Sequence, residues 1–270
     1  MIEDTSKEFI GRHIGPSDND EKKMLETVGA KSLNDLIKKT VPENILLKND
    51  LKIDKPLSEN DALKKLKAIS KKNEYFRNFI GMGYYNTITP NVILRNILEN
   101  PGWYTQYTPY QPEISQGRLE ALLNYQTMIT QITALPIANA SLLDEGTAAS
   151  EAMLMLFRKN KSEKKQFLVD EECFQQTIDV IISRAKPLDI EIIITDFNSF
   201  DFTNAFGCII QYPNRYGYIS SEKHYKNIVS KAHESNCKVI FASDLMCLQL
   251  FEAPGNLGAD ISVGNSQRFG

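Results

Sequence analysis

The sequence predicts an α/β fold with a mostly parallel sheet, preceded by an N-terminal helical region. From residue 166 onward, short runs rich in Val and Ile alternate with stretches of helical periodicity. Strands that alternate with helices form parallel sheets covered on both faces. The first seventy-odd residues show only the helical pattern. We therefore place a helical region at 1–75 and an α/β domain, incomplete at its C-terminal end, at 76–270.

The composition excludes several classes of protein. Basic residues number 31 and acidic residues 34, a net charge of −3, whereas nucleic-acid binders usually show a basic excess. No run of about eighteen apolar residues is present, so we expect no membrane span. The N-terminal MIEDTSKEF is acidic and polar, unlike a signal peptide, which favours a cytoplasmic location.

Cysteine and histidine spacing gives no metal-ligand pattern. We expect no metal, and reduced, mostly buried thiols. The residues concerned are Cys173, Cys208, Cys237, Cys247, His13, His224 and His233.

Short helices are expected in 1–75, each beginning after a serine that has an aspartate three residues later. A serine hydroxyl at the N-cap accepts a hydrogen bond from a free backbone amide, and an acid in the first turn favours the positive end of the helix. The pairs are Ser17 with Asp20, Ser32 with Asp35, and Ser58 with Asp61. The apolar faces of these helices must pack on something else.

Helices are also expected between 89 and 160. Thr89-Pro90 predicts a helix start, with Thr as the cap, and Pro101-Gly102 a stop. The aromatic, proline-containing segment 103–112 is expected to be non-helical. A long helix should run from Ser115 to about Ala134, and another should follow LLDEG.

Five apolar runs are predicted to be the strands. They are QFLVD (166–170), IEIIITD (190–196), GCIIQY (207–212), KVIFAS (238–243) and DISVGN (260–265). A helical stretch at 173–185 separates the first run from the second, and another at 221–234 separates the third run from the fourth. The chain stops soon after the last run, which is typical of a truncated domain.

Two glycine motifs have to be assessed. Gly81-Met82-Gly83 lacks the third glycine of a dinucleotide fingerprint, and no βαβ unit follows it. Gly146 and Thr147 open a helix, as a phosphate cup would, but two acids, Asp144 and Glu145, precede them. This is either a close-packed, self-capped helix start or a degenerate cup that no longer binds phosphate.

A long central block carries a resemblance to a known family. The block is FIGMGYYNTITPNVILRNILENPGWYTQYTPYQPEISQGRLEALLNYQTMI; FIGRHIGP, LLDEGTAASEAM and GADISVGNSQRFG add to it. Together they resemble the pyridoxal-phosphate-dependent glycine decarboxylases, the P-proteins of the glycine cleavage system. The resemblance covers nearly the whole chain, which matches part of the first half of the family's sequence.

The resemblance implies an aspartate-aminotransferase-like large domain. It also implies two similar halves that pack like the subunits of a dimer, in one chain or in two, within a dimeric or heterotetrameric assembly. Only the second half carries the cofactor lysine. The family decarboxylates glycine on pyridoxal phosphate and passes the aminomethyl group to the lipoyl arm of H-protein. The lysine-bearing half, glycine and lipoylated H-protein are therefore the implied partners.

The resemblance further implies that this half lacks the cofactor lysine. Asp244 takes the place of the aspartate that binds the pyridine nitrogen, and Arg268 stands where the lysine is expected. An arginine is permanently protonated and cannot form the imine. Pyridoxal phosphate would then be bound by the other half.

The aromatic segment is the candidate for lining that partner site. Prolines would hold Tyr107, Tyr110 and Glu113 with little conformational freedom to lose. Tyrosines are also common where two halves merely pack, so both interpretations stay open. Arg118, in the first turn of the next helix, opposes the helix dipole and calls for a partner such as Glu113 or a substrate carboxylate.

Two other functions are compatible with the sequence. The chain could be a non-catalytic structural or regulatory subunit that lines no active site. A self-sufficient pyridoxal phosphate enzyme of another kind is disfavoured by Arg268.

Overall fold

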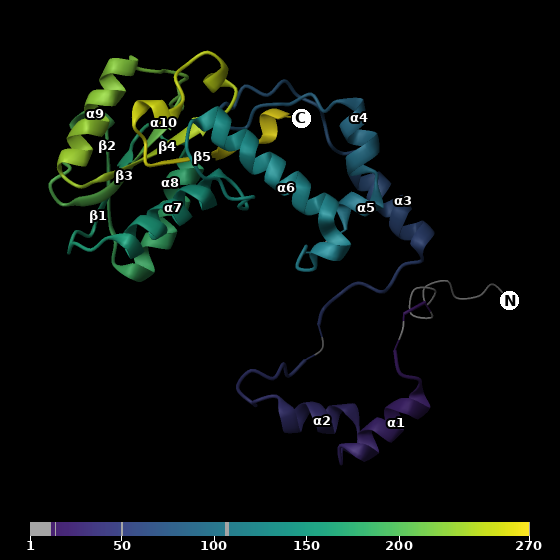
Figure 1. Cartoon of the computed structure of the whole chain (residues 1–270). Helices are drawn as coiled ribbons and strands as arrows, with labels where there is room; N and C mark the ends of the chain where they lie inside the picture. Colours follow the sequence, from purple (N-terminus) through teal and green to yellow (C-terminus); the bar gives the residue numbers. More distant parts are fainter. Residues whose placement is uncertain (1–11, 14, 50, 106–107, 270) are drawn as a thin grey trace. The chain divides into compact units, whose positions relative to one another are not determined.

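The structure, a computed structural model, describes residues 12–13, 15–49, 51–105 and 108–269 (Figure 1). The chain divides into two units, Met1–Arg77 and Asn78–Gly270. The first contains three helices within its described residues, and the second contains the sheet. None of the described helices has the length and hydropathy needed to cross a lipid bilayer.

The helices of the first unit begin where the serine caps predict. They are α1 (Asp18–Thr27), α2 (Leu33–Thr40) and α3 (Glu59–Ser70). In each, the cap serine accepts a hydrogen bond from the backbone amide of the aspartate three residues later. In α1 the bond is reciprocated, because Ser17 N also donates to Asp20 Oδ2 at 3.3 Å. The local capping prediction is confirmed.

No residue of these three helices is buried. Most of their large apolar side chains are exposed, among them Met24, Leu33, Ile37, Leu66 and Ile69. Helices this short are marginal in water without tertiary packing. The apolar faces therefore remain available for packing.

The second unit contains a five-stranded sheet in the order β2-β1-β3-β4-β5. Every pairing is parallel, so the predicted sheet is confirmed. Its strands are β1 (Gln166–Asp170), β2 (Glu191–Thr195), β3 (Ala205–Tyr212), β4 (Lys238–Asp244) and β5 (Ile261–Asn265). Each overlaps one of the predicted apolar runs. Because the strands are parallel, their carboxyl ends lie along one edge of the sheet.

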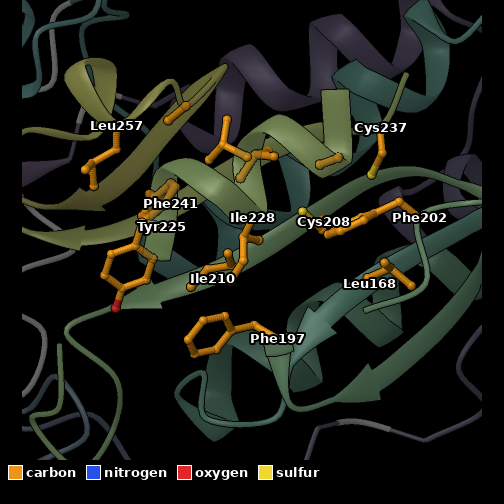
Figure 2. Packing of buried hydrophobic residues seen from close by; sticks show 14 of the residues in the cluster. Leu168, Phe197, Phe202, Cys208, Ile210, Tyr225, Ile228, Cys237, Phe241 and Leu257 are labelled. Atoms are coloured by element: carbon orange, nitrogen blue, oxygen red, sulfur yellow. The ribbon is translucent and has the colours of Figure 1, made fainter. Parts of the chain in front are cut away.

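Helices cover both faces of the sheet. On one face α7 (Glu145–Lys159) and α8 (Gln175–Ala185) pack against β1, β3 and β4. On the other, α9 (Glu222–Glu234) and α10 (Pro254–Leu257) pack on the same strands (Figure 1). Figure 2 shows the second cluster, in which Tyr225 and Ile228 of α9 lie near Ile210 and Phe241. The central strands are buried on both faces, which explains their continuous apolar runs.

The thiols belong to this core. Cys173, Cys208 and Cys237 are buried and free, and Cys247 is half-buried. The prediction that the thiols are mostly buried is confirmed.

Several boundaries before the sheet differ from the predictions. Pro90 lies before the helix rather than in it: α4 (Asn91–Ile93) passes into the π-helical η3 (Leu94–Leu98), and no side chain caps α4. The backbone of Pro90 is extended, with ψ at 138°.

The aromatic segment is partly helical, which corrects the expectation. Residues Pro101–Tyr104 form α5, because Asn100 Oδ1 accepts from Gly102 N at 2.9 Å and Pro101 suits the first turn. The next helix, α6 (Pro112–Thr133), begins at Pro112 and contains a non-helical residue at Ser115. The remaining short helices are η4 (Lys186–Leu188), η5 (Phe197–Ser199), η6 (Cys247–Gln249) and η7 (Gln267–Phe269).

Asp260 joins the starts of β4 and β5. Its carboxylate accepts from Lys238 Nζ at 2.8 Å and from Val239 N at 2.9 Å, and lies 2.7 Å from His233 Nε2. Burial opposes ionisation, but these hydrogen bonds outweigh it and lower the pKa of Asp260. One side chain thus holds the last strand and the end of α9 against β4.

Replacing Asp260 with Asn should destabilise the chain by about 1.5–3 kcal/mol at pH 7, because hydrogen bonds to a charged group are lost. A lowered pKa stabilises the fold above the unfolded pKa near 3.8, and this contribution disappears as the pH falls through the folded value. The difference in the free energy of unfolding between variant and parent, measured by urea titration, should therefore shrink as the pH falls toward 3. The exposed Asp54→Asn is the control, and an equal loss in both variants would contradict the role of Asp260.

Candidate functional site

A cavity of about 180 Å³ lies at the carboxyl ends of the sheet. The last residues of β4 and β5, the starts of α7 and α8, and the segment Gly83–Tyr85 line it. In open α/β sheets, ligands bind in the crevice beyond the carboxyl ends of the strands. This cavity is therefore the position at which the fold would hold a cofactor.

Asp244, the last residue of β4, pairs with Arg268 of η7 in this cavity. Arg268 Nη2 lies 2.6 Å from Asp244 Oδ2, and Nε lies 3.1 Å from Oδ1. The two-point hydrogen bond with Asp244 raises the pKa of Arg268 further above its already high value. On its other side the guanidinium carbon lies 4.2 Å from the ring centroid of Tyr85. The residues that the resemblance placed at the family's aspartate and lysine positions are thus in direct contact.

A close approach of β5 to β4 makes the pair possible. Any Cβ at Gly264 would lie 2.3 Å from the carbonyl oxygen of Ser243. Only glycine fits there without movement of the strands. From Gly264 the chain turns at once into η7, which carries Gln267 and Arg268.

The start of α7 is self-capped. Asp144 Oδ1 accepts from Thr147 N at 2.7 Å, and hydrogen bonding with Thr147 lowers the pKa of Asp144. Gly146 is buried where a Cβ would lie 3.5 Å from Gln176 O and 3.3 Å from Val180 of α8. These are the contacts of a close-packed, self-capped helix start.

Glu145 carries less charge than the sequence suggested. Burial raises its pKa to about 7, and Asp244 and Asp144 add to the rise, while a hydrogen bond from Gln211 opposes it. Gln211 Nε2 lies 3.3 Å from Glu145 Oε1 and 3.0 Å from Ala242 O. At neutral pH, Asp144 is fully charged and Glu145 only partly charged.

The Gly-Met-Gly motif forms a turn at the rim of this cavity. Gly81, Met82 and Gly83 have φ values of 65°, 56° and 86°, all in the left-handed region. At Gly83 a Cβ would also lie 3.1 Å from the ring of Phe174. The glycines serve the turn, in agreement with the rejection of a dinucleotide fingerprint.

The cavity does not fit pyridoxal phosphate. Ligand pockets usually enclose at least about 300 Å³, whereas this one encloses about 180 Å³. The amide of Thr147 that could bind a phosphate is already bonded to Asp144. Arg268, which is paired with Asp244 in this cavity, cannot form an imine.

The aromatic candidates lie elsewhere in the second unit. Tyr107 is outside the described residues. Tyr110 is 85% exposed, and Glu113 is exposed in the first turn of α6. An open groove of about 380 Å³ lies nearby, lined by Gly102, Trp103, Thr105, Ile114, Ser115, Gly117 and Arg118.

Arg118 anchors the end of α5. Its Nη2 donates to Gly102 O at 2.8 Å, and its Nη1 donates to Thr105 O at 3.2 Å. A guanidinium at the carbonyl end of a short helix offsets the partial negative charge there. From the sequence we expected Arg118 to pair with a carboxylate such as that of Glu113 or a substrate, whereas these two contacts are with backbone oxygens.

Sequence reasoning missed the glutamines around the cavity and the buried Asp170. Gln176 Nε2 donates to Met82 O at 2.7 Å, and Gln267 Nε2 donates to Gly83 O at 2.9 Å. These bonds join residues far apart in the chain, so no local pattern indicates them. Asp170, at the end of β1, could have been noticed as an acid that ends an apolar strand.

Comparisons with known proteins agree on one family. A family model described as Glycine cleavage system P-protein matches residues 11–270. The chain is 57% identical to the glycine dehydrogenase (decarboxylating) of Pelagibacter ubique, over 100% of this chain and 28% of that protein. It is 52% identical to the mitochondrial glycine dehydrogenase (decarboxylating) of Dictyostelium discoideum, over 97% of this chain and 27% of that protein.

A solved structure shares the fold. It is the crystal structure of glycine decarboxylase (P-protein) of the glycine cleavage system, in inhibitor-bound form. The TM-score is 0.77 at 28% identity, covering 94% of this chain and 58% of that chain. The chain thus spans little more than a quarter of the length of these curated relatives.

Asp170 should make stability depend on pH. It is fully buried, one oxygen accepts from Glu172 N at 3.2 Å, and the other has no partner among the described residues. Burial raises its pKa to about 6. Because the folded value lies above the unfolded value near 3.8, this group removes stability as the pH rises from about 4 to 6.

Asp170→Asn should therefore gain stability relative to the parent as the pH rises from 4 to 7, by on the order of 2 kcal/mol. The asparagine keeps an acceptor for Glu172 N and removes the buried charge. Thermal and urea unfolding at several pH values measure the difference. Asp189→Asn, at an exposed position, is the control, and a pH-independent difference for Asp170→Asn would refute the assignment.

Proposed function

Because the chain belongs to the glycine cleavage system P-protein family, we propose that it is the N-terminal part of a glycine dehydrogenase (decarboxylating). The complete enzyme would decarboxylate glycine on pyridoxal phosphate and pass the aminomethyl group to the lipoyl arm of H-protein. The observation that carries the proposal is the similarity over the chain's whole length, 57% identity over 100% of its residues.

The catalytic lysine is assigned to another part of the enzyme. Support comes from the cavity at the end of the sheet, where Arg268 is bonded to Asp244 and α7 caps itself with Asp144. In this proposal pyridoxal phosphate is bound by a lysine-bearing half, in the same chain or in a separate subunit. Residues 1–75 form the N-terminal helical region and residues 76–270 an incomplete large domain.

The partners follow from the same proposal. They are the lysine-bearing half, glycine and lipoylated H-protein, in a dimeric or heterotetrameric assembly. The large apolar side chains exposed on α1–α3 are compatible with such packing. We propose a cytoplasmic location.

This chain contributes the aromatic segment to the neighbouring active site. Tyr110 is exposed, and Glu113 follows it at the start of α6. Arg118 fixes the end of α5, the helix in which the aromatic segment begins. The candidates are Tyr107, Tyr110, Glu113 and, as a support, Arg118.

A non-catalytic structural or regulatory subunit is the second candidate. It is favoured by one observation, the pairing of Arg268 with Asp244 in the cavity. In this alternative the tyrosines only pack against the partner.

The isolated chain should form no imine with pyridoxal phosphate, because Arg268 cannot react and the cavity is small. The purified chain is mixed with the cofactor, and its absorption spectrum is recorded before and after borohydride reduction. Peptide mapping locates any reduced adduct. An adduct on a single lysine at the cavity would overturn the assignment, whereas scattered surface labelling equal to that of an unrelated protein would not.

Tyr110→Phe removes one hydroxyl and keeps the ring. If the hydroxyl bonds a charged group of substrate or cofactor, about 1.5–3 kcal/mol is lost and turnover falls roughly ten- to a hundredfold. Glycine-dependent carbon dioxide exchange is measured on the enzyme assembled with its lysine-bearing half and H-protein.

The exposed Tyr216→Phe is the matched control. The thermal midpoint of each assembly separates turnover from folding. Unchanged exchange in the Phe variants of Tyr107 and Tyr110, together with Glu113→Gln, would leave only the packing interpretation.

A further inference from the structure

The turn Gly81–Tyr85 needs outside support to keep its shape. Three successive residues, including the non-glycine Met82, have positive φ. Such a conformation is unfavourable for a residue with a side chain, and persists where the surroundings determine it. Within the turn, Tyr84 N donates to Gly81 O at 2.9 Å. Just before the turn, Asn78 Nδ2 donates to Tyr84 O at 2.9 Å. Further support comes from other segments.

Two glutamines hold the backbone of the turn. Gln176, in the first turn of α8, donates to Met82 O, and Gln267 of η7 donates to Gly83 O. Both are hydrogen bonds between neutral groups. They hold the carbonyl groups of Met82 and Gly83, and neither bond involves the side chain of Tyr85.

Arg268 holds the last part. Its guanidinium lies over the Tyr85 ring at 4.2 Å, while two of its nitrogens bind Asp244. Asp244 ends a strand that is buried along most of its length. Tyr85 is thereby tied through Arg268 to the end of this buried strand, while the neighbouring Tyr84 stays 55% exposed.

The guanidinium suits both contacts at once. It is planar, binds a carboxylate in two-point fashion through its edge and stacks on an aromatic ring through its face. A lysine ammonium would pair with Asp244 as a point charge without fixing the plane above Tyr85. A glutamine would leave Asp244 without its cation.

We propose that Arg268 is a positioning residue, which holds Tyr85 and with it the turn Gly81–Tyr85 in the arrangement that the lysine-bearing half requires. This inference rests on the proposed function. In this proposal Arg268 stands at the position of the lysine and also positions the turn for the partner half. The turn would present Tyr84 to the partner, and the Asp244–Arg268 pair would set its direction.

The test measures the turn directly in the assembled enzyme. Hydrogen exchange followed by mass spectrometry compares peptides over 78–88 with peptides of α9 in the parent, Arg268→Gln, Tyr85→Leu and Tyr85→Phe. Arg184→Gln, an exposed arginine of α8, is the matched control. Glycine-dependent exchange activity and the thermal midpoint are recorded for each assembly.

We expect Arg268→Gln and Tyr85→Leu to speed exchange at 78–88 by about tenfold, with α9 unchanged. Their turnover should fall well beyond any change in the folded fraction. Tyr85→Phe keeps the ring face and should match the parent. A merely structural ion pair would not respond to Tyr85→Leu, so this variant separates positioning from stability.

Arg268→Gln could fail to fold, because Asp244 would be left half-buried without its cation. The double variant Asp244→Asn/Arg268→Gln removes that charge and should fold with the turn still loosened. Unchanged protection at 78–88 in the folded variants would overturn the proposal, and so would a loosened turn with full turnover. A parent assembly without glycine exchange would instead refute the proposed function, while the hydrogen-exchange result still reports on Arg268.

Discussion

The two-point ion pair between Asp244 and Arg268 connects every part of the candidate site. Asp244 belongs to the sheet, Arg268 follows the last strand, and the guanidinium reaches the turn at Tyr85. Pairing a charge at the end of a buried strand avoids the large cost of leaving it half-buried alone. The pair lies in the cavity beyond the carboxyl ends of the strands and contacts its rim at Tyr85.

The rest of the site depends on how tightly the neighbouring elements approach. Gly264 lets β5 lie against Ser243, and Gly146 lets α7 lie against α8. Asp144 caps the start of α7, while Glu145, whose pKa is raised to about 7, is only partly ionised near neutral pH. Together these features produce a small cavity in which Asp244 is paired with Arg268 and the start of α7 is capped by Asp144.

Much of the fold was predictable because its signals are local. The serine caps depend on residues three apart, and the strands on continuous apolar runs. The helix boundaries at Pro101 and Pro112 were predicted less well, because proline suits both a turn and the first turn of a helix. Asp244 and Arg268 were assigned through resemblance, and their contact follows from the parallel order of β4 and β5.

The sequence by itself determined the alternation of helices and strands, the helix starts and the chemical character of residue 268, since these depend on near neighbours and on side-chain type. Only the tertiary structure decided what Arg268 binds, that Gln176 and Gln267 hold the turn, and how far Glu145 is charged. Such properties depend on burial and on contacts between residues separated by up to 184 positions. The order of residues along the chain does not show how far a group is removed from water or how close two distant residues lie, and these two factors set such properties.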